Sequence, residues 1–490
     1  MTLSAASLLS DSKLVKTKSY INGQWVGHEK QFPVVNPADQ SVLIQVADGD
    51  ALQTELAVEA AHDALANWRG LTANVRADYL RKWFDLMMAH QDELAMIMTL
   101  EQGKPLAEAK GEVKYGASFV EWYAEEGKRI YGDTIPSLGS HQRILVMKQP
   151  IGVAAAITPW NFPNSMITRK AAPALAAGCT FVIRPAETTP LSALALAELA
   201  DQAGIPAGVF NVVVGTDAQA MGEVLTQHPK VAKFSFTGST GVGKKLMAQC
   251  ATTVKNFTME LGGNAPFIVF DDADIGAAIE GAIASKYRNA GQTCVCANRF
   301  FVQESKVKEF TEKFAQAVAS LPMGAGMEPG VEIGPLIHPE AQQQVKQLVE
   351  QSVSQGAKVV LGGQPHALGP AFYQPTILSD VTVAMPVAQK EIFGPVAPII
   401  AFKDEADVIA KANDSEFGLA AYFYARDLGR VWRVAEALEY GIVGINEGII
   451  SNAAAPFGGV KQSGIGREGS KYGIEDYLET KYLCIGGITD

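Results

Sequence analysis

The chain has 490 residues, of which 48% are hydrophobic and 19% are charged, and its formal net charge is −11. This length and apolar content predict a globular protein of about two to four domains, and the interspersed charges exclude the basic surface that nucleic-acid binding needs. No apolar run approaches the roughly 20 residues of a membrane helix, so we expect neither a nucleic acid nor a membrane as partner.

The cysteine content and the N-terminal segment both bear on the cellular compartment. Five cysteines are an odd and sparse number for this length, which argues against a disulfide framework and fits a reducing compartment. Residues 1–16 have no basic segment before their short apolar patch and contain no arginine, so they do not have the pattern of a signal or transit peptide. We therefore expect a cytoplasmic protein.

The first part of the chain is predicted to form a hairpin followed by helices. Residues 19–26 read as two short strands joined by a turn at Asn22 and Gly23. Apolar residues then recur at helical spacing over three stretches, which are Glu55–Trp68, Val75–Leu100 and Ala107–Arg129. The aromatic residues Trp68, Tyr79 and Trp83 are expected to pack in the core rather than to bind a cofactor.

Strand-like and helix-like runs alternate through the rest of the chain. Between Ile151 and Leu261 they include V-A-A-A-I, C-T-F-V-I-R-P and V-A-K-F-S-F-T-G, with a helix predicted over Ser192–Gln202. The second half continues this alternation with P-F-I-V-F and a predicted helix over Val307–Ser320. Such alternation is typical of βαβ units and parallel sheets, so two α/β domains are expected.

A glycine-rich stretch, G-S-T-G-V-G-K-K at Gly238–Lys245, lies within one residue of the P-loop pattern. Lys245 stands where that pattern has its magnesium-binding hydroxyl, which argues against a nucleotide triphosphatase. The strand-then-helix context favours another use, in which Ser239 and the N–H groups of a helix N-terminus hold a dinucleotide pyrophosphate. This stretch does not have the G-x-G-x-x-G spacing of the usual dinucleotide-binding fingerprint.

Cys294 is a candidate nucleophile, because K-Y-R-N-A-G-Q-T-C-V-C-A-N-R at Lys286–Arg299 places it in a short polar turn between apolar segments. A buried packing cysteine is the alternative. A free cysteine is only roughly a few per cent ionised at neutral pH, so a working nucleophile has to be activated.

Two other motifs supply partners for this cysteine. M-E-L-G-G-N at Met259–Asn264 offers the carboxylate of Glu260 beside two glycines, where we expect neither helix nor strand. T-P-W-N-F-P at Thr158–Pro163 offers the amide of Asn161 in a proline-rich turn. A nucleophile, a base and an oxyanion donor are therefore all present.

The ordered set of motifs T-P-W-N-F-P, F-T-G-S-T, E-L-G-G-N-A-P, G-Q-T-C and E-I-F-G-P resembles the aldehyde dehydrogenase superfamily, and P-F-G-G-V-K-Q-S-G-I-G-R-E-G extends the likeness. The resemblance implies an α/β fold with a variant Rossmann cofactor domain, an α/β catalytic domain and a small β oligomerisation arm. The implied boundaries are residues 1–135 and 157–261 for the NAD-binding domain, 136–156 and 472–490 for the arm, and 262–471 for the catalytic domain. It also implies a homo-oligomer, either a dimer or a tetramer.

The same resemblance implies residue roles. Cys294 would attack the aldehyde, the Asn161 amide and the Cys294 N–H would hold the oxyanion, and Glu260 would activate the water that hydrolyses the thioester. The implied cofactor is NAD, with NADP possible, contacted by Trp160, Arg184, Pro185, Ala186, Glu187, Gly238, Ser239, Leu261, Glu391 and Phe393. Arg184 departs from the lysine that is common in the family, which puts its ribose hydrogen bond in doubt, while Glu187 at the adenine ribose favours NAD over NADP.

Three further positions suggest the substrate. Arg169, Arg288 and Ser451 resemble the carboxylate-binding Arg, Arg and Ser of succinate-semialdehyde dehydrogenases, whereas ordinary surface ion pairs are the alternative for the two arginines. We therefore expect a short semialdehyde acid as the small-molecule partner, succinate semialdehyde first and glutarate semialdehyde next, because one methylene is worth only about 1–3 kcal/mol.

Three alternatives remain open on the sequence. An acylating enzyme would pass the thioester to coenzyme A instead of water, and a non-catalytic ligand-binding protein would need none of the three reactive groups. Cys296 is either a packing residue or the partner of Cys294 in a thiol redox switch.

Overall fold

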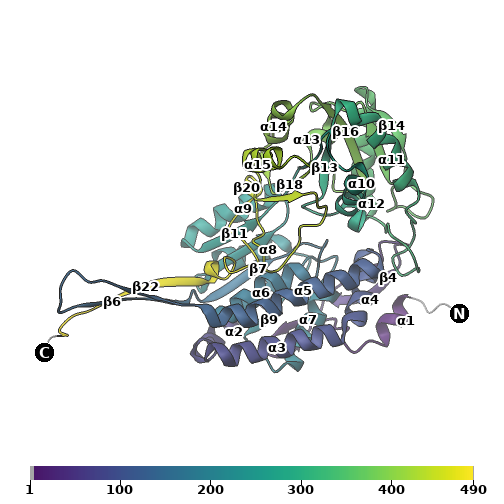
Figure 1. The fold of residues 1–490 in the computed structure, drawn as a ribbon. Helices are drawn as coiled ribbons and strands as arrows, with labels where there is room; N and C mark the ends of the chain where they lie inside the picture. The colour runs from purple at the N-terminus through teal and green to yellow at the C-terminus, as the bar shows by residue number, and fades with distance from the viewer. Residues whose placement is uncertain (1–4, 489–490) are drawn as a thin grey trace.

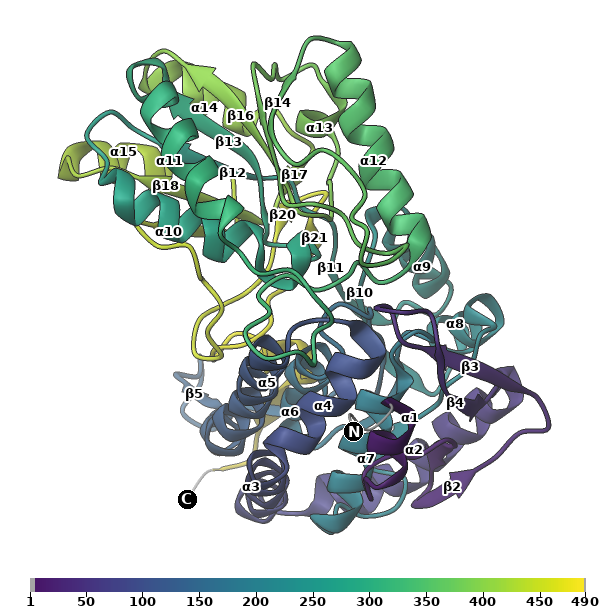
Figure 2. The same ribbon diagram turned by 90° about the vertical axis from the view of Figure 1, so that its right-hand side faces the viewer.

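A computed structural model describes residues 5–488, in which two α/β lobes lie one above the other and a thin arm projects from the lower lobe (Figures 1 and 2). Strands of the lower lobe come almost entirely from the first 260 residues, and those of the upper lobe from the following 185 or so. The two α/β units expected from the alternation of strands and helices are therefore present.

The lower lobe is organised around an eight-stranded sheet with the order β2-β1-β9-β8-β7-β10-β11-β21. Strands β9, β8, β7, β10 and β11 are parallel, and β1, β2 and β21 are antiparallel additions at the edges. The expected hairpin at Asn22 is confirmed, since β1 and β2 pair across it. The strands are β1 (Ser19–Ile21), β2 (Gln24–Val26), β7 (Val153–Ile157), β8 (Thr180–Arg184), β9 (Phe210–Val212), β10 (Val231–Thr237), β11 (Asn256–Glu260) and β21 (Gly464–Ile465).

Helices cover both faces of this sheet, because the side chains of a strand point alternately to either side. In β7, Ala154 and Ala156 face one apolar cluster, whereas Val153, Ala155 and Ile157 face another. The helices are α2 (Ala51–Gly70), α3 (Ala73–Ala89), α4 (Gln91–Gln102), α5 (Leu106–Glu126), α6 (Ser165–Ala177), α7 (Pro190–Gln202), α8 (Ala218–Gln227) and α9 (Thr240–Cys250).

The helical pattern expected over Val75–Leu100 is two helices, α3 and α4, rather than one. The break is at His90, whose backbone leaves the helical region at φ −104° and ψ 21° and whose N–H bonds to Leu86 O. Both helices bury one face against the same core, so the apolar periodicity continues across the break. Periodicity alone could not locate it.

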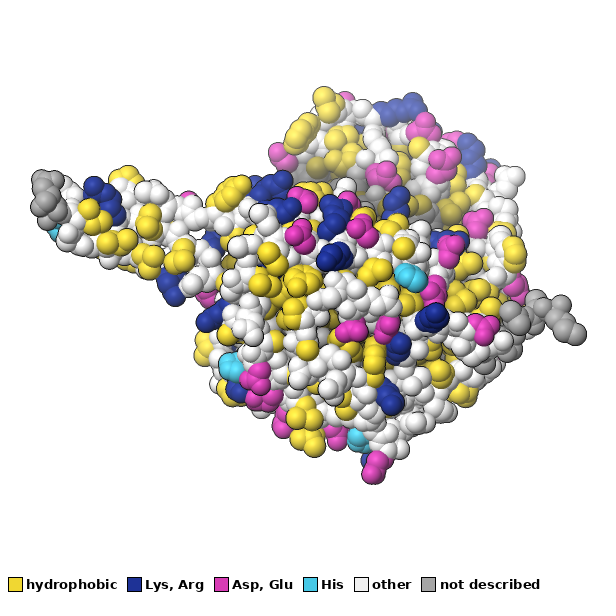
Figure 3. Space-filling view, turned by 90° about the horizontal axis from the view of Figure 1, so that it is seen from below, with side chains coloured by type: hydrophobic (Ala, Val, Ile, Leu, Met, Phe, Trp, Pro, Cys, Tyr) yellow, Lys and Arg dark blue, Asp and Glu magenta, His cyan; other side chains and the backbone are white. Residues whose placement is uncertain are grey.

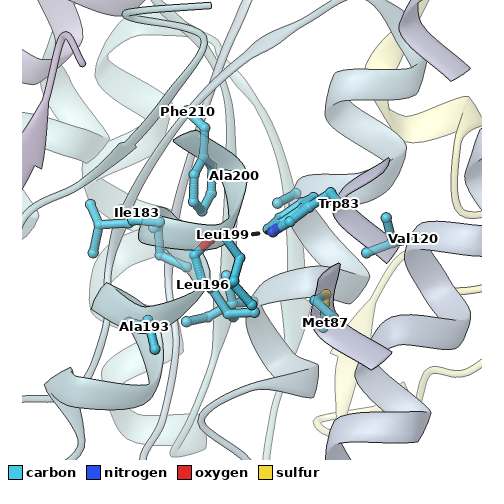
Figure 4. Close-up of a cluster of buried hydrophobic side chains, with 14 of the residues drawn as sticks. Trp83, Met87, Val120, Ile183, Ala193, Leu196, Leu199, Ala200 and Phe210 are labelled. Carbon is cyan, nitrogen blue, oxygen red and sulfur yellow. Dashed lines mark hydrogen bonds between the residues drawn. The ribbon is translucent and has the colours of Figure 1, made fainter. Parts of the chain in front are cut away.

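The large aromatic residues of the first helices pack in the core, as expected for Trp68 and Trp83. Trp83 is fully buried beside Phe210, and its indole N–H donates to Leu196 O at 3.2 Å (Figure 4). Tyr79 is only partly buried. These contacts join α3 to α7 and β9 beneath the sheet.

The upper lobe has a seven-stranded sheet with the order β14-β15-β16-β13-β12-β18-β19, parallel except at β14. Its strands are β12 (Ala265–Val269), β13 (Ala297–Gln303), β14 (Lys358–Leu361), β15 (Thr376–Ser379), β16 (Val396–Phe402), β18 (Ala420–Tyr424) and β19 (Ile442–Ile445). Its helices are α10 (Ile275–Lys286), α11 (Val307–Ala319), α12 (Pro339–Ser354), α13 (Pro386–Gln389), α14 (Glu405–Asn413) and α15 (Leu428–Ala437).

Several short elements complete the described chain. They are α1 (Ala5–Ser10), the pair β3 (Gln31–Val35) and β4 (Val42–Ala47), the pair β17 (Phe417–Gly418) and β20 (Val460–Lys461), and the 3-10 turns η1 (Gly127–Arg129), η2 (Ala251–Thr253), η3 (Arg288–Gly291), η4 (Glu304–Lys306) and η5 (Glu475–Tyr477). Within residues 5–488, every helix is too short or too polar to span a membrane.

The arm is a three-stranded sheet formed by β5 (Asp133–Ile135), β6 (Arg143–Pro150) and β22 (Leu478–Ile485). Strands β6 and β22 pair antiparallel over their whole length, as expected for two distant pieces of chain. Two of the expected domain boundaries do not coincide with the limits of the observed sheets. The arm was expected to extend to residue 156, but Val153–Ile157 is a fully buried apolar strand that forms β7 inside the lower sheet, and Asp133–Ile135 lies in the arm sheet instead of the cofactor domain.

Candidate active site

The candidate nucleophile Cys294 lies between η3 and β13, at the edge of the upper lobe that faces the lower sheet. It is partly exposed and lines a cavity of about 220 Å³ together with Asn161. The pKa of the thiol is raised to about 12, mainly by burial and in part by the carboxyls of Glu391 and Glu260, while the Arg169 cation opposes the shift. Cys294 is therefore a protonated thiol in this state, and its proton has to be removed before it can attack a carbonyl.

Asn161 follows β7 in the loop at the carboxyl edge of the lower sheet, where ligands of α/β proteins bind. It is buried, and its side-chain N–H donates to Gln292 O at 3.0 Å in the loop that carries Cys294. The amide has a second N–H for a further acceptor. Asn161 and Cys294 thus line the same cavity from opposite lobes.

Glu260 is the last residue of β11 and pairs with Thr237 and Gly464. The expectation that neither helix nor strand would contain it was wrong, because β11 continues to the carboxyl edge of the sheet before the glycines begin. Burial raises the pKa of Glu260 well above its usual value, Glu468 raises it further, and Arg169 and Lys170 oppose this. Its Oε2 has no hydrogen-bond partner, so the carboxyl is free to take a proton.

The expected cofactor residues fall into two groups. Trp160, Gly238, Ser239, Leu261, Glu391 and Phe393 line the same cavity as Cys294. Ser239 caps the N-terminus of α9, where Val242 N–H donates to its hydroxyl at 3.4 Å, so the predicted strand-then-helix context is confirmed.

Three features of the cavity wall fit a bound dinucleotide. Thr237 lines the cavity, and its buried hydroxyl has no hydrogen-bond partner. Glu391 accepts from Gly263 N–H at 3.1 Å, and burial raises its pKa to about 7 against the opposing effects of that N–H and Lys286. Phe393 adopts φ 52°, which is strained for a bulky residue, and its ring meets Trp160 edge-on at 5.6 Å.

The second group, residues 184–187, begins at the last residue of β8. Arg184, Pro185 and Ala186 are buried, whereas the Glu187 side chain is about half exposed. Arg184 Nη2 bonds to Glu187 Oε2 at 2.8 Å and to Gly215 O at 2.9 Å. The arginine that replaces the expected lysine is therefore engaged with the neighbouring carboxylate.

The three expected substrate residues differ in their surroundings. Arg169 is buried, its Nε lies 2.6 Å from Glu468 Oε2, and its guanidinium stacks 4.0 Å from the Phe457 ring. Arg288 is partly buried over Phe162 and has no ion pair within 4.0 Å among residues 5–488. Neither arginine forms the ordinary surface ion pair that was the alternative for them.

Ser451 lies beside Tyr115, which was not predicted from the sequence as a site residue. The Tyr115 hydroxyl is close enough to Arg169, Arg288 and Ser451 for all three to oppose the rise that burial causes in its pKa. Ser451 and Tyr115 also line a surface cavity of about 800 Å³. Tyr115 belongs to no motif, and its only sequence signal was its place on the predicted helix Ala107–Arg129.

A second group missed from the sequence surrounds Glu468. Although burial opposes it, the Lys170 and Arg169 cations keep the pKa of Glu468 below its usual value. Lys170 forms a buried ion pair with Glu468. The carboxylate of Glu468 in turn contributes to the raised pKa of Glu260. The signal in the sequence was the adjacent basic pair Arg169 and Lys170, whose common partner lies about 300 residues away.

Cys296 is buried, and its thiol approaches the Lys286 and Ala297 carbonyl oxygens at 3.5 Å each. Burial raises its pKa, and the Lys286 ammonium opposes that shift. All five cysteines are free thiols.

Comparisons with known proteins identify relatives of this chain. The model of the aldehyde dehydrogenase family matches residues 25–483. The chain is 62% identical to succinate-semialdehyde dehydrogenase [NADP(+)] of Escherichia coli over 98% of this chain and 99% of that protein. It is 61% identical to glutarate-semialdehyde dehydrogenase of Pseudomonas aeruginosa over 98% and 100%, respectively. The crystal structure of succinate-semialdehyde dehydrogenase from Burkholderia pseudomallei matches with a TM-score of 0.96 at 57% identity, covering 97% of this chain and 99% of that one.

Proposed function

Because the chain belongs to the aldehyde dehydrogenase family, we propose that it oxidises a short semialdehyde acid to the dicarboxylic acid with a nicotinamide cofactor. Succinate semialdehyde is the first candidate substrate and glutarate semialdehyde the second, and two of its relatives are named for these substrates. The observation that carries the proposal is a set of buried donors near Cys294 that lack an acceptor.

These donors are Arg169 Nη2, Arg288 Nε and the Tyr115 hydroxyl, each of which is buried without a hydrogen-bond partner. An unsatisfied buried polar group costs about 1–3 kcal/mol. Guanidinium groups only donate, so what they lack is an acceptor. A substrate carboxylate supplies acceptor oxygens for all three, with Ser451 beside them. Tyr115 therefore joins Arg169, Arg288 and Ser451 in the proposed carboxylate site.

In the proposed mechanism Cys294 loses its proton and attacks the aldehyde carbon, giving a thiohemiacetal. The Asn161 amide and the Cys294 N–H hold the developing oxyanion, and such donors are worth about 3 kcal/mol each. After oxidation to the thioester, Glu260 removes a proton from the water that hydrolyses it. The raised pKa of Glu260 makes its ionised form the stronger base for this step.

The cofactor, when bound, accepts the hydride of the thiohemiacetal. Ser239, Gly238 and the N-terminal N–H groups of α9 suit its pyrophosphate. Glu391 suits a ribose, and Thr237, whose buried hydroxyl has no partner, lines the same cavity. Trp160 and Phe393 supply apolar surface for the nicotinamide.

We propose a preference for NAD over NADP, based on the exposure of the Glu187 carboxylate and the hydrogen bonds of Arg184. The half-exposed Glu187 carboxylate accepts hydrogen bonds from ribose hydroxyls and repels a 2′-phosphate. Arg184, the cation that would attract the phosphate, already bonds to Glu187 and to Gly215 O. The Escherichia coli relative is named for NADP(+), so the proposed preference rests on this pair of residues and not on overall similarity.

The decisive experiment follows absorbance at 340 nm with succinate semialdehyde, glutarate semialdehyde and butanal, each with NAD and with NADP. We expect the acids to react with a far higher kcat/KM than butanal. A product that forms only with added coenzyme A would support the acylating alternative. An absence of turnover with every aldehyde would support a non-catalytic ligand-binding protein.

We also propose a homo-oligomer, a dimer or a tetramer, joined through the arm. Strands β6 and β22 carry exposed apolar side chains, including Leu145, Met147, Tyr482 and Ile485 (Figure 3). Exposed strands of this kind are usually covered by another chain. Light scattering should give the mass of two or four chains, and Leu145→Glu should reduce it.

A cytoplasmic location and a thiol switch at Cys296 remain proposals of the same kind. Both rest on free cysteines, and Cys296 lies two residues from the nucleophile. Peroxide inactivation that dithiothreitol reverses in the parent but not in Cys296→Ala would support the switch, and equal behaviour of the two proteins would contradict it.

A further inference from the structure

The loops that carry Cys294 and Asn161 come from different lobes, and the buried side chain of Asn289 joins them. Its Nδ2 donates to Asn161 O at 3.0 Å and to Gln292 O at 3.2 Å. Its backbone N–H donates to Glu108 Oε2 at 2.8 Å, which ties the same residue to α5. Asn289 therefore contacts the loop that carries Asn161, the loop that carries Cys294 and helix α5.

The direction of the Asn289 amide is determined by a chain of hydrogen bonds that starts at a group able only to donate. Lys104 N–H donates to Gln102 Oε1 at 3.0 Å, so the other end of the Gln102 amide has to be its NH₂. Gln102 Nε2 then donates to Asn289 Oδ1 at 3.0 Å. The Asn289 NH₂ is consequently left facing the two carbonyl oxygens.

These bonds hold Asn161 at both its backbone and its side chain. Asn161 O accepts from Lys104 Nζ at 2.7 Å as well as from Asn289, and the Asn161 side chain donates to Gln292 O at 3.0 Å. Gln292 is itself held, because its Nε2 donates to Asn289 O and its Oε1 accepts from Ile337 N–H at 2.9 Å. The amide that faces the reacting carbon has little freedom to turn.

The backbone around Asn289 is strained. Asn289, Ala290 and Gly291 take φ of 51°, 53° and 79° in succession. Asparagine tolerates this region better than most residues, whereas alanine does not. At Gly291 an added Cβ would lie 2.2 Å from Gly394 O, so only glycine fits. Strain of this kind persists where the surroundings hold it and gathers at functional sites.

We propose that Asn289 is a positioning residue for the oxyanion site: its amide holds the Asn161 loop against the Cys294 loop, so that the Asn161 N–H and the Cys294 thiol meet one carbonyl carbon. The inference rests on the proposed function, in which Asn161 stabilises the thiohemiacetal oxyanion. Asn289 itself acts through Asn161, without touching the substrate.

The test is a double-mutant cycle between Asn289→Asp and Asn161→Ala. The aspartate keeps the size, the tolerance of positive φ and the acceptor for Gln102, but replaces the NH₂ that faces two carbonyl oxygens. Asn161→Ala should lower kcat about 100- to 1000-fold, and Asn289→Asp alone about 10- to 100-fold with KM for the semialdehyde unchanged. In the Asn161→Ala background, Asn289→Asp should change kcat by less than about threefold, because the group it positions is gone.

Alkylation of Cys294 by iodoacetamide separates positioning from loss of structure, since this reaction develops no oxyanion. The stoichiometry at Cys294, read from its peptide by mass spectrometry because Cys484 is also exposed, counts reactive sites, and the rate constant at Cys294 should stay within about twofold of the parent in Asn289→Asp. Asn211→Asp is the matched control. The Asn211 amide likewise donates to two carbonyl oxygens and accepts a hydrogen bond from one N–H. It is buried in β9, however, next to the β1–β2 hairpin of the lower sheet. It should lower the melting temperature without changing kcat per alkylated site.

Gln102→Glu is the second variant, for use if Asn289→Asp does not fold. It removes the donor that orients the Asn289 amide and should lower kcat per site by about threefold to tenfold with the alkylation rate unchanged. The inference is wrong if Asn289→Asp, or Gln102→Glu in its place, keeps the parental kcat per site, or if its effect multiplies fully with that of Asn161→Ala. If Asn161→Ala itself is fully active, the oxyanion role in the proposed function fails instead.

Discussion

Replacement of Arg288 by methionine is the sharpest test of the proposed carboxylate site. Methionine keeps an unbranched apolar stem against Phe162 and removes only the charge and its N–H groups. Arg288 has no ion pair within 4.0 Å in the described chain, so its loss leaves no protein carboxylate unpaired. Arg169 is a poorer target, because its replacement would also remove its buried ion pair with Glu468.

The expected magnitude follows from the charge pair that is lost. Two unit charges about 4 Å apart interact by about 4 kcal/mol at an effective dielectric constant of about 20, and truncating one partner of a buried charge pair costs about 2–5 kcal/mol. Since 1.36 kcal/mol corresponds to about tenfold, kcat/KM for succinate semialdehyde should fall about 30- to 5000-fold.

The assay compares succinate semialdehyde with butanal at 340 nm in the parent and in Arg288→Met. Butanal carries no carboxylate, so its kcat/KM should change by less than about threefold. Arg426→Met is the control variant, because its ion pair with Asp274 at 2.9 Å is exposed on the surface. The reasoning is refuted if Arg288→Met oxidises the acid as well as the parent does, or if it loses butanal activity to the same extent.

Three further predictions concern the nucleophile, the cofactor and the base. Cys294→Ala should lower kcat more than about a thousandfold while NAD binding, measured by fluorescence titration, stays within about threefold, and residual turnover above a thousandth would exclude Cys294 as the nucleophile. Glu187→Ser should raise the NADP-to-NAD ratio of kcat/KM by about tenfold or more, because it removes a repulsive carboxylate and frees Arg184 for a 2′-phosphate, and an unchanged ratio would contradict the role of this pair. Burial raises the pKa of Glu260 well above 4.5, so the ionised form that acts as the base is lost as the pH falls through this raised pKa. The rate of thioester hydrolysis in single-turnover experiments should therefore rise with pH through the same range. In Glu260→Gln this rate should be low and independent of pH.

Local patterns in the sequence were enough to predict the two α/β units, the hairpin at Asn22 and the strand-then-helix unit at Ser239. Each depends on short-range physics, such as alternation of apolar residues, a turn at Asn-Gly or a helix N-cap. The break at His90 was not predictable in this way, because α3 and α4 bury their apolar faces in one core and the periodicity runs through the turn. The end of β11 at Glu260 was missed since adjacent glycines suggested a loop.

The sequence by itself determined which reactive groups the chain contains: a cysteine in a polar turn, a carboxylate beside glycines and an amide in a proline-rich loop. Only the tertiary structure decided what surrounds them. Tyr115 reaches the two arginines from α5, Glu468 pairs with Arg169 and Lys170 from across the chain, and Asn289 joins two loops of different lobes. These contacts depend on how whole helices and sheets pack, which no local pattern of residues encodes. They determine the pKa values of the reactive groups and the orientation of their side chains.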